Sequence, residues 1–248
     1  SRRTGAAGAG AAADGAGLLV AEISNPHYPF EAGAYDTIGY ARSVAVAGNR
    51  VVLADEHNGL VILNISDPIH PIMSGSVQLE GWAFDVTVSG NLAYVAAAFG
   101  GLQIVNISNP AVPVVSGSIT WSRSNTVSVA AANGHILIAD RKNGLRVMDI
   151  SDPASPSEIG YWNIFSMAYA VDIHNNYAYV AAGFNGIRIY SLSDPSHPVE
   201  MGSFLADGFF YMVKVSEDRL FAGTMTGSSQ GGLYAWDISD PADPILLG

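Results

Sequence analysis

The hydrophobic pattern that dominates this sequence is short and recurs along the chain. In residues 58–71, NGLVILNISDPIHP, apolar side chains occupy both phases of the alternation. Leu60 and Ile62 would lie on one face of a strand, and Val61 and Leu63 on the other. A strand that is apolar on both faces must be covered on both faces, and the SDP triplet after it marks a turn.

Five further copies of this phrase occur in the chain. They read GLLVAEISNPHYP (17–29), GGLQIVNISNPAVP (100–113), NGLRVMDISDPASP (143–156), NGIRIYSLSDPSHP (185–198) and GGLYAWDISDPADP (231–244). The glycine before the apolar run recurs at intervals of 42, 42, 43, 42 and 46 residues, at Gly17, Gly59, Gly101, Gly144, Gly186 and Gly232. A glycine at this point predicts a left-handed conformation or a close backbone approach. A period of about 40–45 residues is typical of a four-stranded propeller blade.

A second block recurs within each period and predicts a hairpin. Its five copies are VAVAGNRVVLA (44–54), VTVSGNLAYVA (86–96), VSVAAANGHILIA (127–139), VDIHNNYAYVA (171–181) and VKVSEDRLFAG (213–223). Each has two β-branched or aromatic runs around a pair that tolerates positive φ. The hairpin supplies the first two strands of each unit, the repeated phrase the third, and the segment after the second proline (72–79 in one copy) the fourth.

These units predict an all-β fold, a β-propeller of four-stranded antiparallel blades. Stacking the sheets face to face covers both apolar sides, and closing the circle removes the exposed ends. The phrase occurs six times and the hairpin five times. We therefore expect a six-bladed ring with an incomplete first blade, with a five-bladed ring as the alternative. Residues 17–248 would form one propeller domain, with units starting near 17, 59, 101, 144, 186 and 232.

Composition narrows the partners. The net charge of −11 argues against nucleic acid and anionic lipid, which need clustered Lys and Arg. The absence of cysteine excludes disulfides, zinc–thiolate sites and thiol catalysis. The sequence contains no run of 18 apolar residues, so no membrane insertion is expected. Residues 1–16, SRRTGAAGAGAAADGA, are interpreted as a flexible or truncated leader, and the chain as a possible part of a longer multidomain protein.

The phrase GL-x-I-x-[DN]-I-S-[DN]-P-x-x-P, preceded by V-x-V-x-G-N-x-x-Y-V-A, resembles the LVIVD repeat of bacterial and archaeal proteins. The resemblance covers about residues 17–248. It implies a β-propeller and a secreted, periplasmic or cell-surface location, and it implies no catalytic residues.

The polar positions of the phrase predict scaffold rather than chemistry. The column that ends each third strand should accept backbone N–H bonds from the next turn; it consists of Glu22, Asn64, Asn106, Asp149, Ser191 and Asp237. The residue before the first proline should cap that turn; this column is Asn25, Asp67, Asn109, Asp152, Asp194 and Asp240. The functional alternative for the aspartates of these two columns is a calcium site. For His27, His70 and His197 it is a metal site formed by the three histidines. Each of these residues lies on a different blade, which favours turn roles.

Function is expected where loops converge. If the first strand is innermost, the segment before it and the second-to-third-strand loop share one face and surround the channel mouth. We call this the loop face. Its candidate ligand-binding residues are Tyr40, Arg42, Asp55, His57, Trp82, Phe84, Asp85, Phe99, Arg123, Asp140, Arg141, Tyr169, Phe184 and Tyr211, with Glu56, Asn125, Phe209 and the insert 224–230 beside them. The alternative is that the aromatic residues plug the channel.

Two functions follow from this face. The first is a non-catalytic module that binds a protein, peptide, glycan or other surface polymer, because Tyr, Trp and Arg anchor interfaces. The second is a propeller hydrolase or lyase, with Asp85 and His57, or Asp55 and Asp140, as its acid–base pair. The first is favoured, with no catalytic residue, no metal and no cofactor expected.

Overall fold

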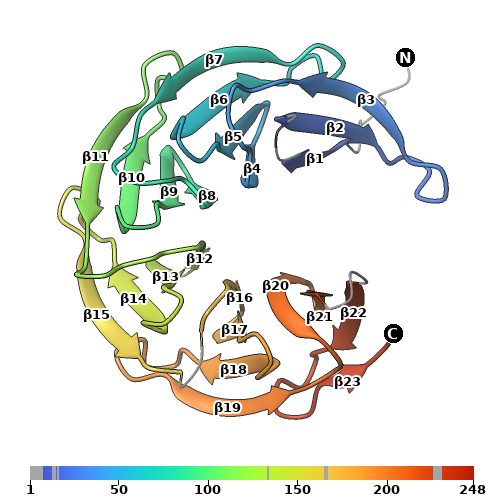
Figure 1. The fold of residues 1–248 in the computed structure, drawn as a ribbon, viewed down its shortest axis with the longest axis vertical. Helices are drawn as coiled ribbons and strands as arrows, with labels where there is room; N and C mark the ends of the chain where they lie inside the picture. The colour runs from blue at the N-terminus through green and yellow to red at the C-terminus, as the bar shows by residue number, and fades with distance from the viewer. Residues whose placement is uncertain (1–7, 13–14, 16, 133, 165–166, 226–230) are drawn as a thin grey trace. The chain divides into compact units, whose positions relative to one another are not determined.

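The computed structural model describes residues 8–12, 15, 17–132, 134–164, 167–225 and 231–248. The chain divides into two compact units, residues 1–118 and 119–248. Each unit is a series of antiparallel sheets that follow one another along the chain (Figure 1).

The first unit holds three sheets. The first sheet has three strands in the order β1-β2-β3, and the other two have four strands each in sequence order. The strands are β1 (Gly8–Ala12), β2 (Leu18–Glu22), β3 (Phe30–Tyr35), β4 (Ser43–Ala47), β5 (Arg50–Ala54), β6 (Leu60–Asn64), β7 (Ile72–Val77), β8 (Asp85–Ser89), β9 (Leu92–Ala96), β10 (Leu102–Asn106) and β11 (Val114–Ile119).

The second unit holds three four-stranded sheets, again in sequence order. Their strands are β12 (Ser128–Ala132), β13 (His135–Ala139), β14 (Leu145–Asp149), β15 (Ser157–Trp162), β16 (Ala170–His174), β17 (Tyr177–Ala181), β18 (Ile187–Ser191), β19 (Val199–Phe204), β20 (Phe209–Ser216), β21 (Arg219–Met225), β22 (Gly232–Asp237) and β23 (Ile245–Leu246).

The predicted fold class is confirmed by five four-stranded antiparallel meanders, each built from the hairpin, the phrase and the segment after it. Two boundaries are corrected. Residues 8–12, assigned to the leader, form β1 and pair with β2 because a backbone edge can be paired even by an Ala/Gly run. Phe209 and Tyr211, placed before the last hairpin, lie inside β20, which is extended through a bulge between Phe210 and Met212. Residues 1–7, 13, 14 and 16 of the leader, and residues 226–230 of the insert 224–230, lie outside the described residues.

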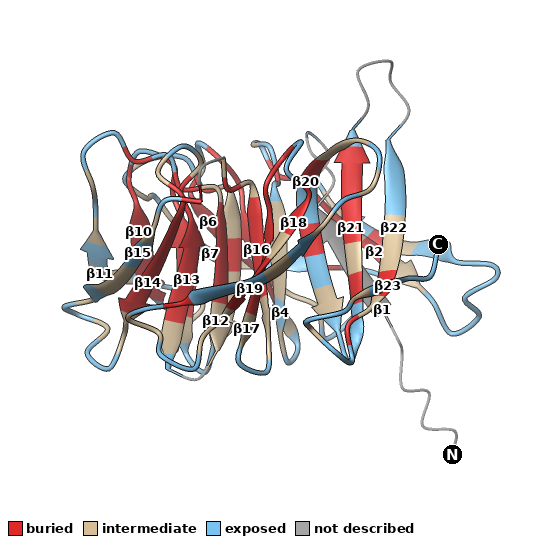
Figure 2. Cartoon of the chain, turned by 90° about the horizontal axis from the view of Figure 1, so that it is seen from below, coloured by how far each residue is buried: buried red, intermediate tan, exposed pale blue. Residues whose placement is uncertain are grey.

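The core lies between neighbouring sheets, as the two-sided apolar strands predicted. Leu60, Val61, Ile62 and Leu63 of β6 are all buried. In the second unit, the third strand β14 is largely buried, whereas the fourth strand β19 is largely exposed (Figure 2). First strands of consecutive sheets lie side by side, β4 against β8 in the first unit, and β12 against β16 and β16 against β20 in the second.

The glycine that precedes each third strand has the conformation that the phrase predicts. Its φ lies between 71° and 80° at Gly17, Gly59, Gly101, Gly144 and Gly186. A Cβ on Gly59 would stand 2.3 Å from the carbonyl oxygen of Val77, so both φ and space require glycine. Gly232 is the exception, because it already belongs to β22.

The two polar columns of the phrase are structural in all six copies. The first column accepts the N–H of the residue two positions on, at 2.8–2.9 Å in five copies and 3.4 Å at Ser191. The second column does the same at 3.0–3.2 Å. The N–H bonds from Ser151 and Ser239 hold the pKa of Asp149 and Asp237 below its ordinary value. The prediction of scaffold is supported at each position.

The histidines of the phrase belong to the same turns. His70 Nδ1 lies 2.9 Å from Asp67 Oδ2, and His197 Nδ1 lies 3.2 Å from Asp194 Oδ2. His70 and His197 therefore each have a partner three residues away in their own turn, and the backbone N–H of His27 donates to Asn25 Oδ1 at 3.2 Å. Among the described residues, no three His, Cys, Asp or Glu side chains gather as a metal ion would require.

Candidate functional site

The second-to-third-strand loops are tight turns of one repeated geometry. In the first of them, Asp55 N–H donates to Gly59 O at 2.9 Å, and Asn58 N–H donates to Asp55 O at 2.9 Å. The second residue of the turn has positive φ in four copies, at Glu56, Ala98, Arg141 and Gly183. This backbone leaves the third residue at the surface, where Phe99 is 59% and Phe184 79% exposed.

A backbone bridge ties three of these turns to the segment before the next sheet. Glu56 and Ala83 exchange two backbone hydrogen bonds of 3.1 Å in the first unit. In the second unit, bridges join Arg141 to Ala168 and Gly183 to Phe210. Because a bridge fixes the residues on both sides of it, loops of consecutive sheets present their side chains together. The predicted convergence of these two segments is thus observed within each unit.

In the first unit, the convergence produces an aromatic cluster centred on Trp82. Its ring centroid lies 4.5 Å from that of His57, 6.1 Å from Phe99 and 6.5 Å from Phe84. We call His57, Trp82, Phe84 and Phe99 the first aromatic cluster. Trp82 remains 42% exposed, so the cluster is a surface and not a core.

An ion pair between Arg42 and Glu56 lies next to this cluster. Arg42 Nε donates to Glu56 Oε1 at 2.5 Å, and the Arg42 guanidinium lies 5.8 Å from the ring centre of Tyr40. Glu56 is buried, and its other oxygen lies 3.4 Å from His57 Nδ1. The buried carboxylate therefore holds Arg42 and His57 at the edge of the aromatic surface.

The second unit carries a corresponding group, the second aromatic cluster, formed by Arg141, Tyr169, Phe184 and Phe209. The centroid of Phe209 lies 4.7 Å from Tyr169 and 5.0 Å from Phe184, and Arg141 lies over Tyr169 at 5.6 Å. Gly183 makes room for them, since a Cβ there would meet Phe209 at 2.9 Å. Tyr211 lies on the β20 bulge and is 41% exposed.

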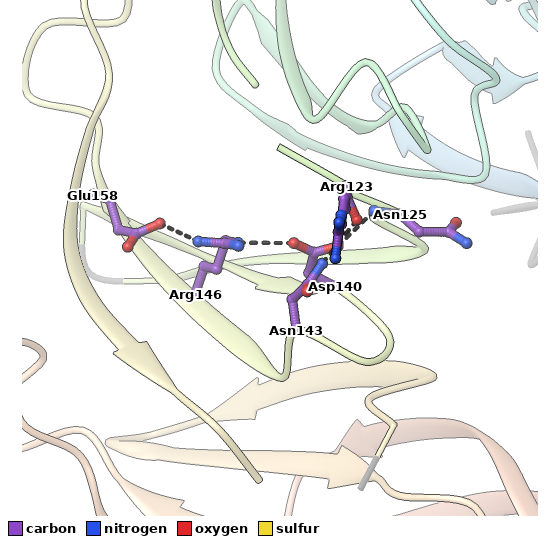
Figure 3. A network of polar contacts seen from close by, with 6 residues as sticks. All are labelled: Arg123, Asn125, Asp140, Asn143, Arg146 and Glu158. Carbon is purple, nitrogen blue, oxygen red and sulfur yellow. Dashed lines mark hydrogen bonds and ion pairs between the residues drawn. The ribbon is translucent and has the colours of Figure 1, made fainter. Parts of the chain in front are cut away.

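Asp55 and Asp140, predicted as surface ligands, are fully buried, and that part of the prediction is corrected. Asp55 accepts from Thr37 Oγ1 at 2.9 Å and from Asn58 Nδ2 at 3.1 Å. Asp140 accepts from Asn125 N–H at 2.6 Å and from Arg146 Nε at 2.8 Å (Figure 3). Each carboxylate is thus occupied within its own unit and anchors its loop.

Arg123 and Asp85 also have structural roles. Arg123 has φ of 62°, and its carbonyl oxygen accepts from Asn143 Nδ2 at 3.0 Å (Figure 3). Asp85, in β8, accepts from Ser43 Oγ of the neighbouring β4 at 2.5 Å. Asp85 therefore joins two first strands.

Asp85 and His57, one of the suggested acid–base pairs, each contact other groups. Asp85 accepts from Ser43, and His57 contacts Glu56 and Trp82. Asp55 and Asp140, the other suggested pair, accept from partners in separate units. Each of these carboxylates is therefore engaged by structural partners within its own unit.

The polar network around Arg146 was not predicted from the sequence. Arg146 is buried in β14 and donates to both Asp140 and Glu158 (Figure 3). Its guanidinium also lies 4.3 Å from the ring centre of Trp121. The signal was present, because an arginine occupies a third-strand position that is Val61 in the β6 copy.

Comparisons with known proteins identify the repeat and the fold. The family model described as the LVIVD repeat matches residues 12–37, 38–78, 80–120, 124–163, 167–206 and 226–248. No curated protein matches the chain. Among solved structures, the chain is similar to the computationally designed Ika8 protein, at 14% identity and a TM-score of 0.69 over 96% of this chain and 70% of that one. It is also similar to a functionally unknown protein from Desulfotomaculum acetoxidans, at 13% identity and a TM-score of 0.76 over 93% of this chain and 75% of that one. The antiparallel blades are those of a β-propeller, as predicted.

Proposed function

The chain belongs to the LVIVD repeat family, and on that premise we propose that it is a non-catalytic binding module, acting outside the cytoplasm, whose loop face holds a protein or a surface polymer. The observation that carries the proposal is the exposed first aromatic cluster. Four aromatic side chains from three loop segments are gathered at a surface where a soluble protein would bury them.

The chemistry of both clusters supports binding. Trp, Tyr and Arg are the side chains that contribute most to interfaces, because they bury a large area at a small cost in conformational entropy. Trp82 and Phe99 in the first unit, and Phe184 in the second, are exposed although their backbone is fixed by turns and bridges. A rigid aromatic surface of this kind loses little freedom when a partner covers it.

Charge favours the same class of partner. With a net charge of −11, nucleic acid and anionic lipid are poor ligands. In the part of the chain that the structure describes, no helix has the length and apolar character needed to cross a membrane. The extracytoplasmic location is carried over from the family, and cell fractionation of the native organism tests it.

Labelled protein applied to a glycan array and a peptide array tests the binding function. The double variant Trp82→Ala, Phe99→Ala removes the exposed part of the first aromatic cluster. We expect it to weaken binding at least about tenfold, as loss of central aromatic anchors does. Tyr28→Ala is the matched control, since Tyr28 is 77% exposed and lies in the turn between β2 and β3. Equal binding by the double variant and the parent protein would contradict this role.

A further inference from the structure

A cavity of about 490 Å³ lies in the first unit, away from the aromatic clusters. Its walls are the hairpin turns 47–50 and 90–91, together with Val46, Val88 and Ile107. These turns join β4 to β5 and β8 to β9, which are neighbouring sheets in Figure 1. The cavity therefore stands at the opposite end of β5 and β9 from the loop face.

Arg50 is the charged side chain that lines this cavity. The guanidinium makes one long hydrogen bond, from Nη1 to Ile107 O at 3.3 Å. No carboxylate forms an ion pair with Arg50 among the described residues, whereas Arg146 and Arg188 each have a glutamate. A guanidinium has five N–H donors arranged to meet a carboxylate through two parallel bonds.

The second unit has a smaller cavity, of about 140 Å³, at the corresponding place. His135 is the first residue of β13 as Arg50 is of β5, and Leu192 takes the place of Ile107. The Nδ1 atom of His135 is buried and has no hydrogen-bond partner. A basic group thus faces a hollow at the same point of the repeat in both units, whereas the next sheet of the first unit has Leu92 there.

We infer that the first-unit cavity binds a small organic carboxylate. Arg50 forms paired hydrogen bonds with the carboxylate, and the apolar part of the ligand packs against Val46, Val88 and Ile107. The volume accommodates a ligand with a single ring, and no lining acid repels the anion. This site is separate from the loop face, so its occupation does not depend on the proposed partner.

Titration calorimetry with benzoate tests the site, with benzamide as the neutral analogue of the same shape and inorganic phosphate as a second anion. We expect benzoate to bind at least about tenfold more tightly than benzamide, because only the carboxylate can pair with Arg50. Phosphate lacks an apolar part, so we expect it to bind more weakly than benzoate. Phosphate binding as tight as benzoate binding would overturn the assignment to a carboxylate.

The variant Arg50→Leu should weaken benzoate binding at least about tenfold, and Arg50→Lys should lose part of it because an ammonium lacks the paired donors. Leucine is the residue that β9 carries at this position, so the fold should be retained, as circular dichroism would verify. Arg219→Leu is the control: Arg219 opens β21 as Arg50 opens β5, and the change in charge is the same. Equal binding by the parent and Arg50→Leu, or equal losses in Arg50→Leu and Arg219→Leu, would overturn the site, as would no heat with benzoate.

Discussion

The sheets β12–β15 and β16–β19 carry the same ion pair in different surroundings. Arg146 Nη1 lies 2.7 Å from Glu158 Oε2, and Arg188 Nη1 lies 2.6 Å from Glu200 Oε1. Both pairs join the third strand of a sheet to its fourth strand. At this level the two sheets are copies of one another.

They differ at one residue of the preceding turn. Asp140 accepts from Arg146 Nε at 2.8 Å, which completes the network drawn in Figure 3. The corresponding residue of the next sheet is Ala182, and the Nε atom of Arg188 is buried without a partner. The repeat therefore fixes the backbone, whereas a single turn residue decides whether the third-strand arginine is paired at Nε as well as at Nη1.

Removal of each arginine should produce the largest difference in stability between the two sheets. Arg146→Leu leaves the fully buried Asp140 without its cation, so we expect a loss of about 3–5 kcal/mol in the free energy of unfolding. Arg188→Leu leaves no buried charge unpaired, because its partner Glu200 is 40% exposed to solvent. That variant should lose about 1 kcal/mol or less in the free energy of unfolding. Urea unfolding of both variants measures the difference. Equal losses would mean that Asp140 contributes nothing to the pairing.

Much of the fold could be predicted because the repeat states it several times. Alternation in both phases required sheets covered on both faces, and a glycine before each third strand required positive φ, as at Gly59. The caps at Asn64 and Asp67 followed from the same logic, since an Asx side chain reaches the N–H two residues on. The strand β1 was missed because an Ala/Gly run carries no alternation.

The candidate site was predicted as a set of loops and not as contacts. Trp82 and Phe99 were placed on one face, but their packing around a common centre depends on the bridge from Glu56 to Ala83. Asp55 was misjudged, because a carboxylate in a loop is exposed in most proteins and burial is decided by partners distant in sequence, here Thr37. Side-chain depth is a tertiary property, and periodicity does not encode it.

A single substitution can give Arg188 an acid at the position that Asp140 occupies beside Arg146. Ala182→Asp places a carboxylate where Asp140 stands in the preceding sheet, and we expect a gain of about 1–2 kcal/mol in the free energy of unfolding. Ala97→Asp is the matched control. Ala97 is the same turn residue in the β8–β11 sheet, where Gln103 replaces the arginine, so an unpaired buried charge should destabilise that variant. Destabilisation by both variants in thermal unfolding would show that the turn cannot accept an acid next to Arg188.

The smallest expected effect concerns the second strands of the same two sheets. Leu137 of β13 faces Val147, and Tyr179 of β17 faces Ile189 in the same register. The Tyr179 hydroxyl is buried without a hydrogen-bond partner. Tyr179→Phe should therefore change the free energy of unfolding by less than about 1 kcal/mol at neutral pH.

At alkaline pH the stabilities of the parent protein and Tyr179→Phe should diverge. Burial raises the pKa of Tyr179 from 10.0 to about 12, because the tyrosinate is poorly solvated. The unfolded chain then loses this proton first, so the stability contribution is complete below pH 10.0 and is lost as pH rises towards about 12. Between these pH values, Tyr179→Phe should lose less stability than the parent protein. Part of the loss should remain in the variant, because burial also raises the pKa of Tyr190 to about 12. Urea midpoints at intervals of pH, with the exposed Tyr28→Phe as control, measure the effect; parallel curves for Tyr179→Phe and the parent would show that the Tyr179 hydroxyl is hydrated in the folded state.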